Sequence, residues 1–364
     1  MHKEQITERE AIYLLITFLM GSTLIIGVGG AAKNDAWIAG IVGIVAAIPI
    51  VFIYSRIISL FPGRDLFDIL NITMGKVAGK IVAFLYIWYS FHLGALVIRN
   101  FGEFVNTVAL PETPIFVPMF YLGLVCVIAV RSGVEVMARI SAYTLPVLIF
   151  IIGIVLSLAI PIMNLNYLKP VLGNGIVPVL KGGFNAFSFP FAETVLFLGV
   201  FFSLSKEKSP YKVYFSGLLF AGVIIVALTI RNISILGNLL DMLYFPAHVA
   251  VGRISIGDFL QRIEITVAVV FVFGAFIKTS VCLLVACVGI GRVFKLSGYR
   301  SIVIQTGLLM IYFSYFVYDS IMLMNYWAFE IYAYYAFPFQ VIIPVLIWTA
   351  AEIKARKVRE PQAQ

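Results

Sequence analysis

Residues 11–31 have the sequence AIYLLITFLMGSTLIIGVGGA, an apolar run that is broken near its middle by Gly21-Ser22-Thr23. A helix needs about 20 mostly apolar residues to cross the hydrocarbon of a bilayer, and this run meets that length. It is longer than the roughly 7 to 15 apolar residues of a signal-peptide core, and a polar stretch precedes it. We therefore expect an uncleaved first transmembrane helix with an interruption near its centre.

The chain as a whole is also strongly apolar. Of the 364 residues, 62% are hydrophobic and 12% are charged, whereas a soluble domain carries about 25% charged residues. Because lipid offers no hydrogen bonds to the backbone, helices are favoured. We predict an all-α integral membrane protein, with a single transmembrane domain over residues 1–364. The net charge of +8 comes from basic residues scattered between apolar runs, so no nucleic-acid partner is expected.

Ten apolar segments are candidates to span the bilayer. Ten spans would place both termini on one side, and eighteen of the 26 Lys and Arg residues fall in loops of that side, against six on the other. The positive-inside rule then predicts cytoplasmic termini. The alternative is nine or eleven spans, with a re-entrant piece within residues 231–262. The expected spans are residues 11–31, 36–58, 81–109, 114–130, 140–163, 181–204, 212–230, 263–290, 301–320 and 334–351.

Three connecting or terminal segments carry further expectations. Residues 59–80 form the longest cytoplasmic loop, with an amphipathic helix expected around Leu66 to Leu70. Residues 239–251, in the longest outside connection, are expected to form short surface helices. The polar tail over residues 360–364 is expected to be disordered.

Helix-breaking residues concentrate in the first and sixth spans. Gly21-Ser22-Thr23 and Gly27 interrupt the first span, and Phe187-Ser188-Phe189-Pro190 follows a pair of glycines in the sixth. These positions correspond if residues 1–163 and 164–351 are two five-helix halves, followed by a cytoplasmic tail over 352–364. Matching interruptions predict two inverted repeats with discontinuous first and sixth helices, and a binding site at the unwound midpoints. The alternative is that the glycines serve close packing and the proline introduces a kink.

Two charged residues are expected deep in the membrane, where a charge is costly. Glu193 is either a ligand or proton site or a helix cap. Lys278 requires a partner, which could be Glu193, a ligand carboxylate or free carbonyls of the broken first span; the alternative is a lysine that extends to an interface. The candidate substrate-binding residues are Gly21, Ser22, Thr23, Gly27, Phe187, Ser188, Phe189, Pro190, Glu193 and Lys278.

A polar stripe runs along the third span. Trp88, His92, Arg99, Glu103 and Asn106 fall on one face at about 100° per residue. Arg99 and Glu103 are four residues apart and can pair. Two interpretations stay open: a vestibule wall with a gating role for His92, Arg99 and Glu103, or an internally neutralised ladder.

Motifs for catalysis are absent from the sequence. It has no metal-ligand cluster and no phosphate-binding loop, and none of its three histidines has a nucleophile and a carboxylate beside it. The three cysteines lie inside apolar runs, where they pack as small hydrophobic residues. We therefore predict no enzymatic activity, no cofactor and no metal site. The functions that remain are recognition of a small solute and its transport across the bilayer.

Several passages resemble the B-subunit family of bacterial spore germinant receptors, which is similar to the amino acid–polyamine–organocation transporters. Each motif alone is weak, and their order along the chain makes the resemblance fairly specific. The passages are Ile6-Thr7-Glu8-Arg9-Glu10, Lys33-Asn34-Asp35-Ala36-Trp37-Ile38, Met74-Gly75-Lys76, Arg99-Asn100-Phe101-Gly102-Glu103, Leu110-Pro111-Glu112-Thr113-Pro114, Phe245-Pro246 and Arg253-Ile254-Ser255-Ile256-Gly257-Asp258-Phe259-Leu260-Gln261-Arg262-Ile263-Glu264.

This resemblance implies a nutrient-sensing subunit of the spore inner membrane, assembled with a larger A-type membrane subunit and a C-type lipoprotein. It also implies that a germinant, often an amino acid, binds among the first, third, sixth and eighth spans. Many relatives have a proline near the glycine-rich end of the first span, where this chain has Gly27-Val28-Gly29-Gly30. A second functional class is a proton- or sodium-coupled secondary amino acid transporter, which needs the same pocket.

Overall fold

The structure is a computed structural model that describes residues 4–205, 207–254 and 262–359. Within these ranges the secondary structure is helical, apart from one isolated β-bridge between Ile6 and Leu204. The predicted disorder of the tail over 360–364 lies outside the described residues, as does most of the motif that begins at Arg253. The all-α fold that the sequence predicts is confirmed for the described part of the chain.

The α-helices follow one another with short 3₁₀ segments between them. In chain order they are α1 (Glu8–Met20), α2 (Thr23–Ile26), α3 (Ala36–Leu60), α4 (Leu66–Val108), α5 (Phe116–Ser132), α6 (Val134–Ala159), α7 (Ile176–Ser188), α8 (Pro210–Leu236), α9 (Pro246–Gly252), α10 (Ile265–Val293), α11 (Val303–Phe316), α12 (Ile321–Tyr326), α13 (Tyr332–Phe337) and α14 (Ile343–Arg359).

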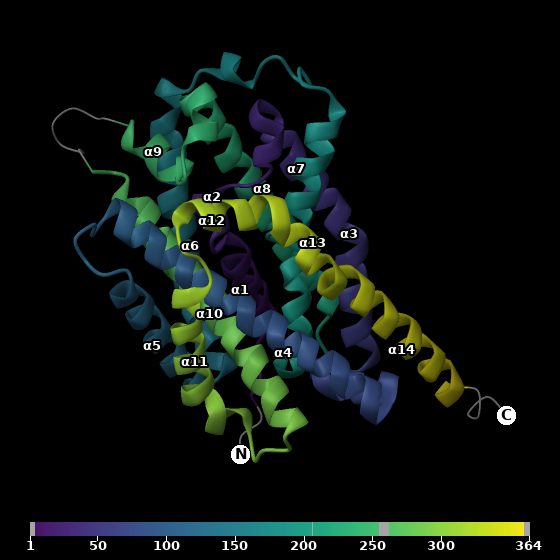
Figure 1. Ribbon diagram of the computed structural model, residues 1–364. Helices are drawn as coiled ribbons and strands as arrows, with labels where there is room; N and C mark the ends of the chain where they lie inside the picture. Colours follow the sequence, from purple (N-terminus) through teal and green to yellow (C-terminus); the bar gives the residue numbers. More distant parts are fainter. Residues whose placement is uncertain (1–3, 206, 255–261, 360–364) are drawn as a thin grey trace.

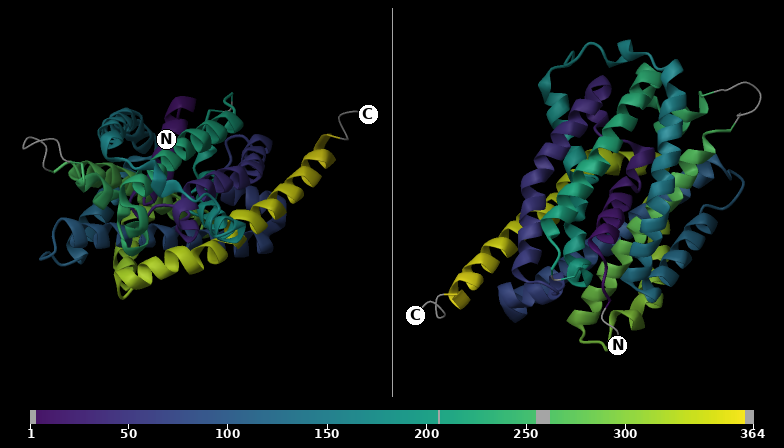
Figure 2. Two further views of the ribbon diagram at one scale, coloured as in Figure 1. Left: turned by 90° about the horizontal axis from the view of Figure 1, so that it is seen from above. Right: turned by 180° about the vertical axis from the view of Figure 1, so that it is seen from behind.

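Helix α1 lies inside the bundle, where it packs against α6, α8 and α10 (Figures 1 and 2). Helix α10 also packs along α4, and α3 packs against α7 and α8. The chain from α12 to α14 runs obliquely across the outside of the bundle. The start of α1 and the end of α14 lie at the same end of the molecule, which we call the terminal face; the other end is the opposite face.

Seven helices of the described residues are long and apolar enough to cross a membrane. The three other predicted spans correspond to α5, to α7 with the 3₁₀ helix Phe191–Gly199, and to α11, which are all shorter. The seven apolar helices indicate a multi-pass membrane protein. The count of ten spans, the inverted repeats and the boundaries of the two halves stay predictions.

Two predicted spans begin earlier in the chain than the sequence indicated. The third was expected from residue 81, but α4 starts at Leu66 and includes the expected amphipathic helix, joined through a kink at Gly75 with φ 80°. The tenth was expected from residue 334, but a bent helix starts at Ile321 and contains two π-helical segments, Trp327–Ile331 and Pro338–Ile342. Glycine makes the left-handed kink possible, and a π-helical bulge lets a helix continue through a bend.

The N-terminal segment is tied to several parts of the terminal face. The carboxylate of Glu4 pairs with Arg300 at 2.5 Å and accepts a hydrogen bond from the Tyr299 hydroxyl at 2.8 Å. Burial, followed by the charge of Glu4, raises the pKa of Tyr299, so its phenol stays protonated and donates. The backbone N–H of Ile6 donates to the Ser203 carbonyl at 2.9 Å. These contacts hold the N-terminal segment against other segments at this face.

Close packing of α1 on α10 gives a testable prediction. A Cβ added at Gly274 would lie 2.9 Å from the Cα of Gly21, which is backbone that cannot move aside cheaply. We expect Gly274→Ala to destabilise the protein by about 1–3 kcal/mol, measured as a lower melting temperature in detergent. Gly153→Ala on α6 is the matched control, because a Cβ there meets nothing within 4 Å. Equal melting temperatures for the two variants would contradict this packing.

Candidate functional site

The first helix break lies between α1 and α2. Helix α1 ends at Met20, and Gly21 turns the chain before α2 begins at Thr23. A Cβ on Gly21 would lie 2.7 Å from the Cδ of Lys278 and 3.0 Å from the Phe18 carbonyl oxygen, so a larger residue here would have to displace the lysine side chain. The Thr23 hydroxyl donates to the Leu19 carbonyl at 3.0 Å and so satisfies one backbone group that the break exposes.

The second break lies between α7 and the 3₁₀ helix Phe191–Gly199. Helix α7 ends at Ser188, Phe189 is extended, and Glu193 falls in the first turn after Pro190. The Ser188 carbonyl, which no longer has a helical partner, accepts a hydrogen bond from Gln340 Nε2 at 2.8 Å. The Ser188 hydroxyl donates to Gln340 Oε1 at 2.8 Å. Gln340 therefore bonds to the end of α7 through both the oxygen and the nitrogen of its side-chain amide, an arrangement that we call the clasp.

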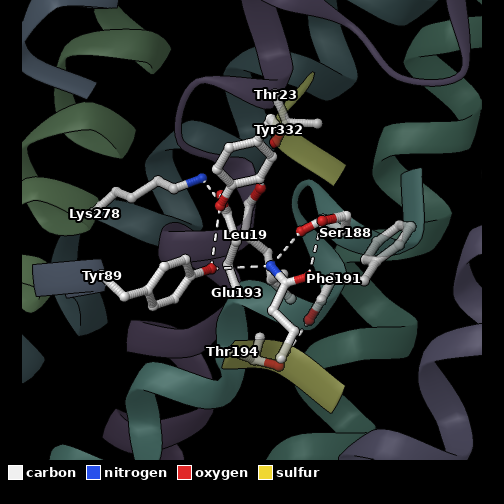
Figure 3. A network of polar contacts seen from close by, with 10 residues as sticks. Leu19, Thr23, Tyr89, Ser188, Phe191, Glu193, Thr194, Lys278 and Tyr332 are labelled. Carbon is white, nitrogen blue, oxygen red and sulfur yellow. Dashed lines mark hydrogen bonds and ion pairs between the residues drawn. The ribbon is translucent and has the colours of Figure 1, made fainter. Parts of the chain in front are cut away.

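Lys278 and Glu193 form an ion pair between α10 and the second break (Figure 3). Both side chains are fully buried. The other Glu193 oxygen accepts a hydrogen bond from the Tyr332 hydroxyl at 2.5 Å. The Lys278 ammonium also lies 4.6 Å from the ring centre of Phe189 and 5.3 Å from that of Phe18, distances at which a cation is attracted to the ring face. Of the partners considered for Lys278, the structure places Glu193 beside it.

A chain of hydrogen bonds continues from this ion pair to the clasp at Ser188. The hydroxyls of Tyr332 and Tyr89 lie 3.2 Å apart, and Gln340 Nε2 donates to Tyr89 at 3.0 Å. Figure 3 shows Lys278, Glu193, Tyr332, Tyr89 and Ser188 converging from different helices. Because all of these groups are buried, movement of one of them leaves another without a partner, which costs free energy.

A small cavity of about 30 Å³ adjoins the ion pair. Glu193, Tyr332 and Phe189 line it, together with three residues that carry unsatisfied polar atoms. Those atoms are Ser22 Oγ, Asn100 Oδ1 and Trp327 Nε1, and none has a hydrogen-bond partner among the described residues. The serine hydroxyl can donate or accept a hydrogen bond, the asparagine oxygen can only accept one, and the tryptophan N–H can only donate one. The cavity therefore offers a small ligand both kinds of hydrogen bond next to two opposite charges.

A larger cavity of about 600 Å³ lies toward the opposite face. Gly27, Lys33, Asn232 and Glu330 are part of its lining, and Ile26 borders both cavities. Glu330 pairs with Lys181 at 2.8 Å. The two cavities are thus adjacent, with the end of α2 between them.

The predicted binding residues differ in where they lie. Ser22, Phe189 and Glu193 line the small cavity, and Gly27 lines the larger one. Gly21, Thr23, Ser188, Pro190 and Lys278 shape the two breaks without lining either cavity, and Phe187 lies with its ring 6.4 Å from that of Phe184, beside α3. Direct ligand contact by any of the ten stays a prediction.

The predicted vestibule residues of α4 line neither cavity. Arg99 and Glu103 are buried and pair at 2.8 Å, and Arg99 also donates to the Tyr315 carbonyl at 2.7 Å. The imidazole of His92 is packed between aromatic rings and stacks on the indole of Trp88, with 5.3 Å between the two ring centres. This geometry favours the neutralised ladder for Arg99 and Glu103, because both charges are already satisfied within the protein.

Sequence reasoning did not identify Tyr89, Asn100, Trp327, Tyr332 and Gln340 as parts of the site. Gln340 could have been found, because an amide within the apolar span 334–351 needs buried partners. Asn100 could also have been found, since it lies one position from Arg99 on a membrane helix. The tyrosines carried no such indication, because tyrosine is common in membrane proteins.

Comparisons with solved structures show which fold this is. The transporter Mhp1 of the nucleobase–cation–symport-1 family, in a closed conformation with bromovinylhydantoin bound, matches with a TM-score of 0.65 and 11% identity, over 90% of this chain and 75% of that one. MhsT in complex with L-phenylalanine matches with a TM-score of 0.63 and 13% identity, over 98% and 97% of the two chains. The fold is that of these membrane transporters.

Sequence comparisons show the family. Spore germination protein KB of Bacillus subtilis (strain 168) is 32% identical over 299 residues, covering 81% of this chain and 80% of the relative. Spore germination protein A2 of the same organism is 27% identical over 90% and 88% of the two chains, and GerQB of Bacillus cereus is 25% identical over 97% and 98%. The family model described as "Spore germination protein" matches residues 5–320. This chain belongs to the spore germination protein family, which is not a class of enzymes.

Proposed function

We propose that this protein is the transporter-like B subunit of a germinant receptor and that it binds a small nutrient, such as an amino acid, between the two helix breaks. The observation that carries this proposal is the buried Lys278–Glu193 ion pair beside a cavity with three unsatisfied polar atoms. A fully buried ion pair is weak evidence for stability alone. Its position at the breaks, with a cavity of about 600 Å³ nearby, supports a role in recognition.

The ion pair suits a zwitterionic ligand. An amino acid carries an ammonium and a carboxylate, which could replace the internal pair by binding to Glu193 and Lys278 respectively. A cavity of about 30 Å³ has room for little more than water, so binding requires the breaks to separate. The ligand then stabilises an arrangement that the empty protein rarely adopts, and this shift is the response.

The proposed receptor function also implies a membrane location and partner subunits. We propose that it resides in the spore inner membrane with both termini cytoplasmic, and that it assembles with an A-type membrane subunit and a C-type lipoprotein. Residues 1–163 and 164–351 would form the two inverted repeats, and residues 352–364 the cytoplasmic tail. The family membership and the excess of Lys and Arg on the side of the termini support this placement.

A second candidate function is secondary transport of an amino acid, coupled to protons or sodium. The fold shared with Mhp1 and MhsT favours it. The two functions differ in an experiment on the natively purified protein. A-type and lipoprotein companions that copurify, with no accumulation of radioactive amino acid in liposomes, support the receptor. A lone protein that accumulates the amino acid against a gradient overturns the receptor in favour of the transporter.

Lys278 gives the sharpest test of the proposed site. Lys278→Met preserves bulk but leaves Glu193 buried without its partner, so we expect loss of the germination response, whereas Lys278→Arg retains part of it. The double variant Lys278→Met, Glu193→Gln removes both charges, and we expect it to fold nearly as stably as the wild type but not to respond. Germination is measured against nutrient concentration, and protein levels are measured by immunoblot.

Lys80→Met, an exposed lysine of α4, is the matched control and should respond normally. A wild-type dose–response curve in the double variant, at wild-type protein level, would show that the ion pair is dispensable for recognition. In that case the pair would serve the fold alone.

Gln340 is predicted to act as a positioning residue rather than a ligand contact. Gln340→Leu leaves the Ser188 carbonyl and the Tyr89 hydroxyl without this partner, at a cost of about 1–3 kcal/mol. We expect a lower melting temperature and a shift of the dose–response curve to several-fold higher nutrient concentration. Gln305→Leu, on the exposed side of α11, is the control. If both variants match the wild type in both measurements, the clasp has no functional role.

A further inference from the structure

Arg231 is a buried arginine that the proposed binding mechanism does not use. It lies near the end of α8 toward the opposite face, with only 3% of its surface exposed. Its Nε and Nη2 both donate to the same oxygen, Asn232 Oδ1, at 3.1 and 2.6 Å. Among the side chains that the structure describes, no carboxylate lies within ion-pair distance of Arg231. Its positive charge is therefore uncompensated by this part of the chain.

A second cavity of about 30 Å³ meets Arg231. Leu24 of α2, Val155 of α6, Ala247 of α9 and Val270 of α10 contribute to its wall, and Arg231 is the one charged residue among its lining. A guanidinium has five N–H donors, and the single oxygen of Asn232 cannot accept them all. An isolated buried charge is strongly disfavoured unless an opposite charge or several hydrogen bonds compensate it.

The dimensions of this cavity restrict what can provide the opposite charge. About 30 Å³ holds one or two water-sized particles, so a whole amino acid or a phosphate group does not fit inside this cavity as the structure has it. The low exposure of Arg231 leaves little access for a lipid headgroup or for a side chain of another protein. Water fits but carries no charge. We propose that Arg231 binds a small monovalent anion of the size of chloride in this cavity.

The cavity lies behind α2, which follows the first helix break of the proposed binding site. Leu24 faces this cavity, whereas Ser22 and Ile26 face the cavity beside the ion pair. Residues two positions apart lie about 200° apart around a helix, so the two cavities border opposite sides of α2. An anion bound at Arg231 therefore packs behind α2 and stabilises the arrangement in which the first break is closed.

The test measures the stability of the purified full chain in detergent while sodium chloride replaces sodium gluconate at constant ionic strength. We expect a saturable rise in melting temperature, on the order of 5 °C. Arg231→Met should abolish this rise. It should also melt higher than the wild type in gluconate, because it removes a buried charge that lacks a partner there. Arg131→Met, an exposed arginine at the end of α5, is the control and should keep the rise.

Equilibrium dialysis with radioactive chloride provides a direct readout, and it covers the case in which Arg231→Met fails to fold. One saturable site in the wild type and in Arg131→Met, weakened at least several-fold in Arg231→Lys, supports the proposal, because lysine keeps the charge but loses the planar fork of donors. No saturable binding in the wild type would mean that the cavity holds water only. Equal binding to wild type and Arg231→Lys, or a chloride effect that persists in Arg231→Met, would also overturn it.

Discussion

The ammonium of Lys278 and the carboxylate of Glu193 share a hydrogen bond in a part of the protein from which solvent is excluded. Separating two such charges in a low-dielectric interior costs several kcal/mol unless new partners replace the old ones. The pair joins α10 to the segment after the second break, and the Lys278 side chain lies across Gly21 at the first break. One interaction therefore fixes the relative positions of three chain segments.

The other polar contacts of the core follow from the two breaks that this pair holds. A helix that stops inside a membrane exposes backbone carbonyls and N–H groups that lipid cannot satisfy. At the first break the Thr23 hydroxyl supplies a hydrogen bond locally. At the second, Gln340 supplies one from a distant helix, which is bent by a π-helical segment at that residue. The bend therefore places the amide where the orphaned carbonyl of Ser188 requires it.

The sequence predicted the fold class and the two interruptions because these depend on local features. Apolar runs, glycines and a proline can be recognised within one predicted span, without knowledge of how the helices pack. A charged residue in such a span, such as Glu193, also indicates that a buried partner exists. The starts of α4 and α12 were missed because amphipathic and bent helical segments are less apolar than a spanning helix. The tyrosines beside Glu193 were missed because only the packing of α4 against α13 decides which tyrosine faces the core.

The same geometry bears on how a transporter fold can serve as a sensor. A transporter must release its ligand on the far side, so its internal contacts have to re-form on both sides of the site at similar cost. Here the segment that precedes α1 is tied to the terminal face by Glu4 and Ile6, while the larger cavity lies toward the opposite face. An asymmetry of this kind favours binding and rearrangement from one side.

In the proposed receptor, the free energy gained when a ligand replaces the Lys278–Glu193 contacts would move α12 to α14, because Tyr332 and Gln340 belong to the same network. The proposed output is therefore a displacement of the C-terminal helix, which lies on the outside of the bundle where a partner subunit could respond to it.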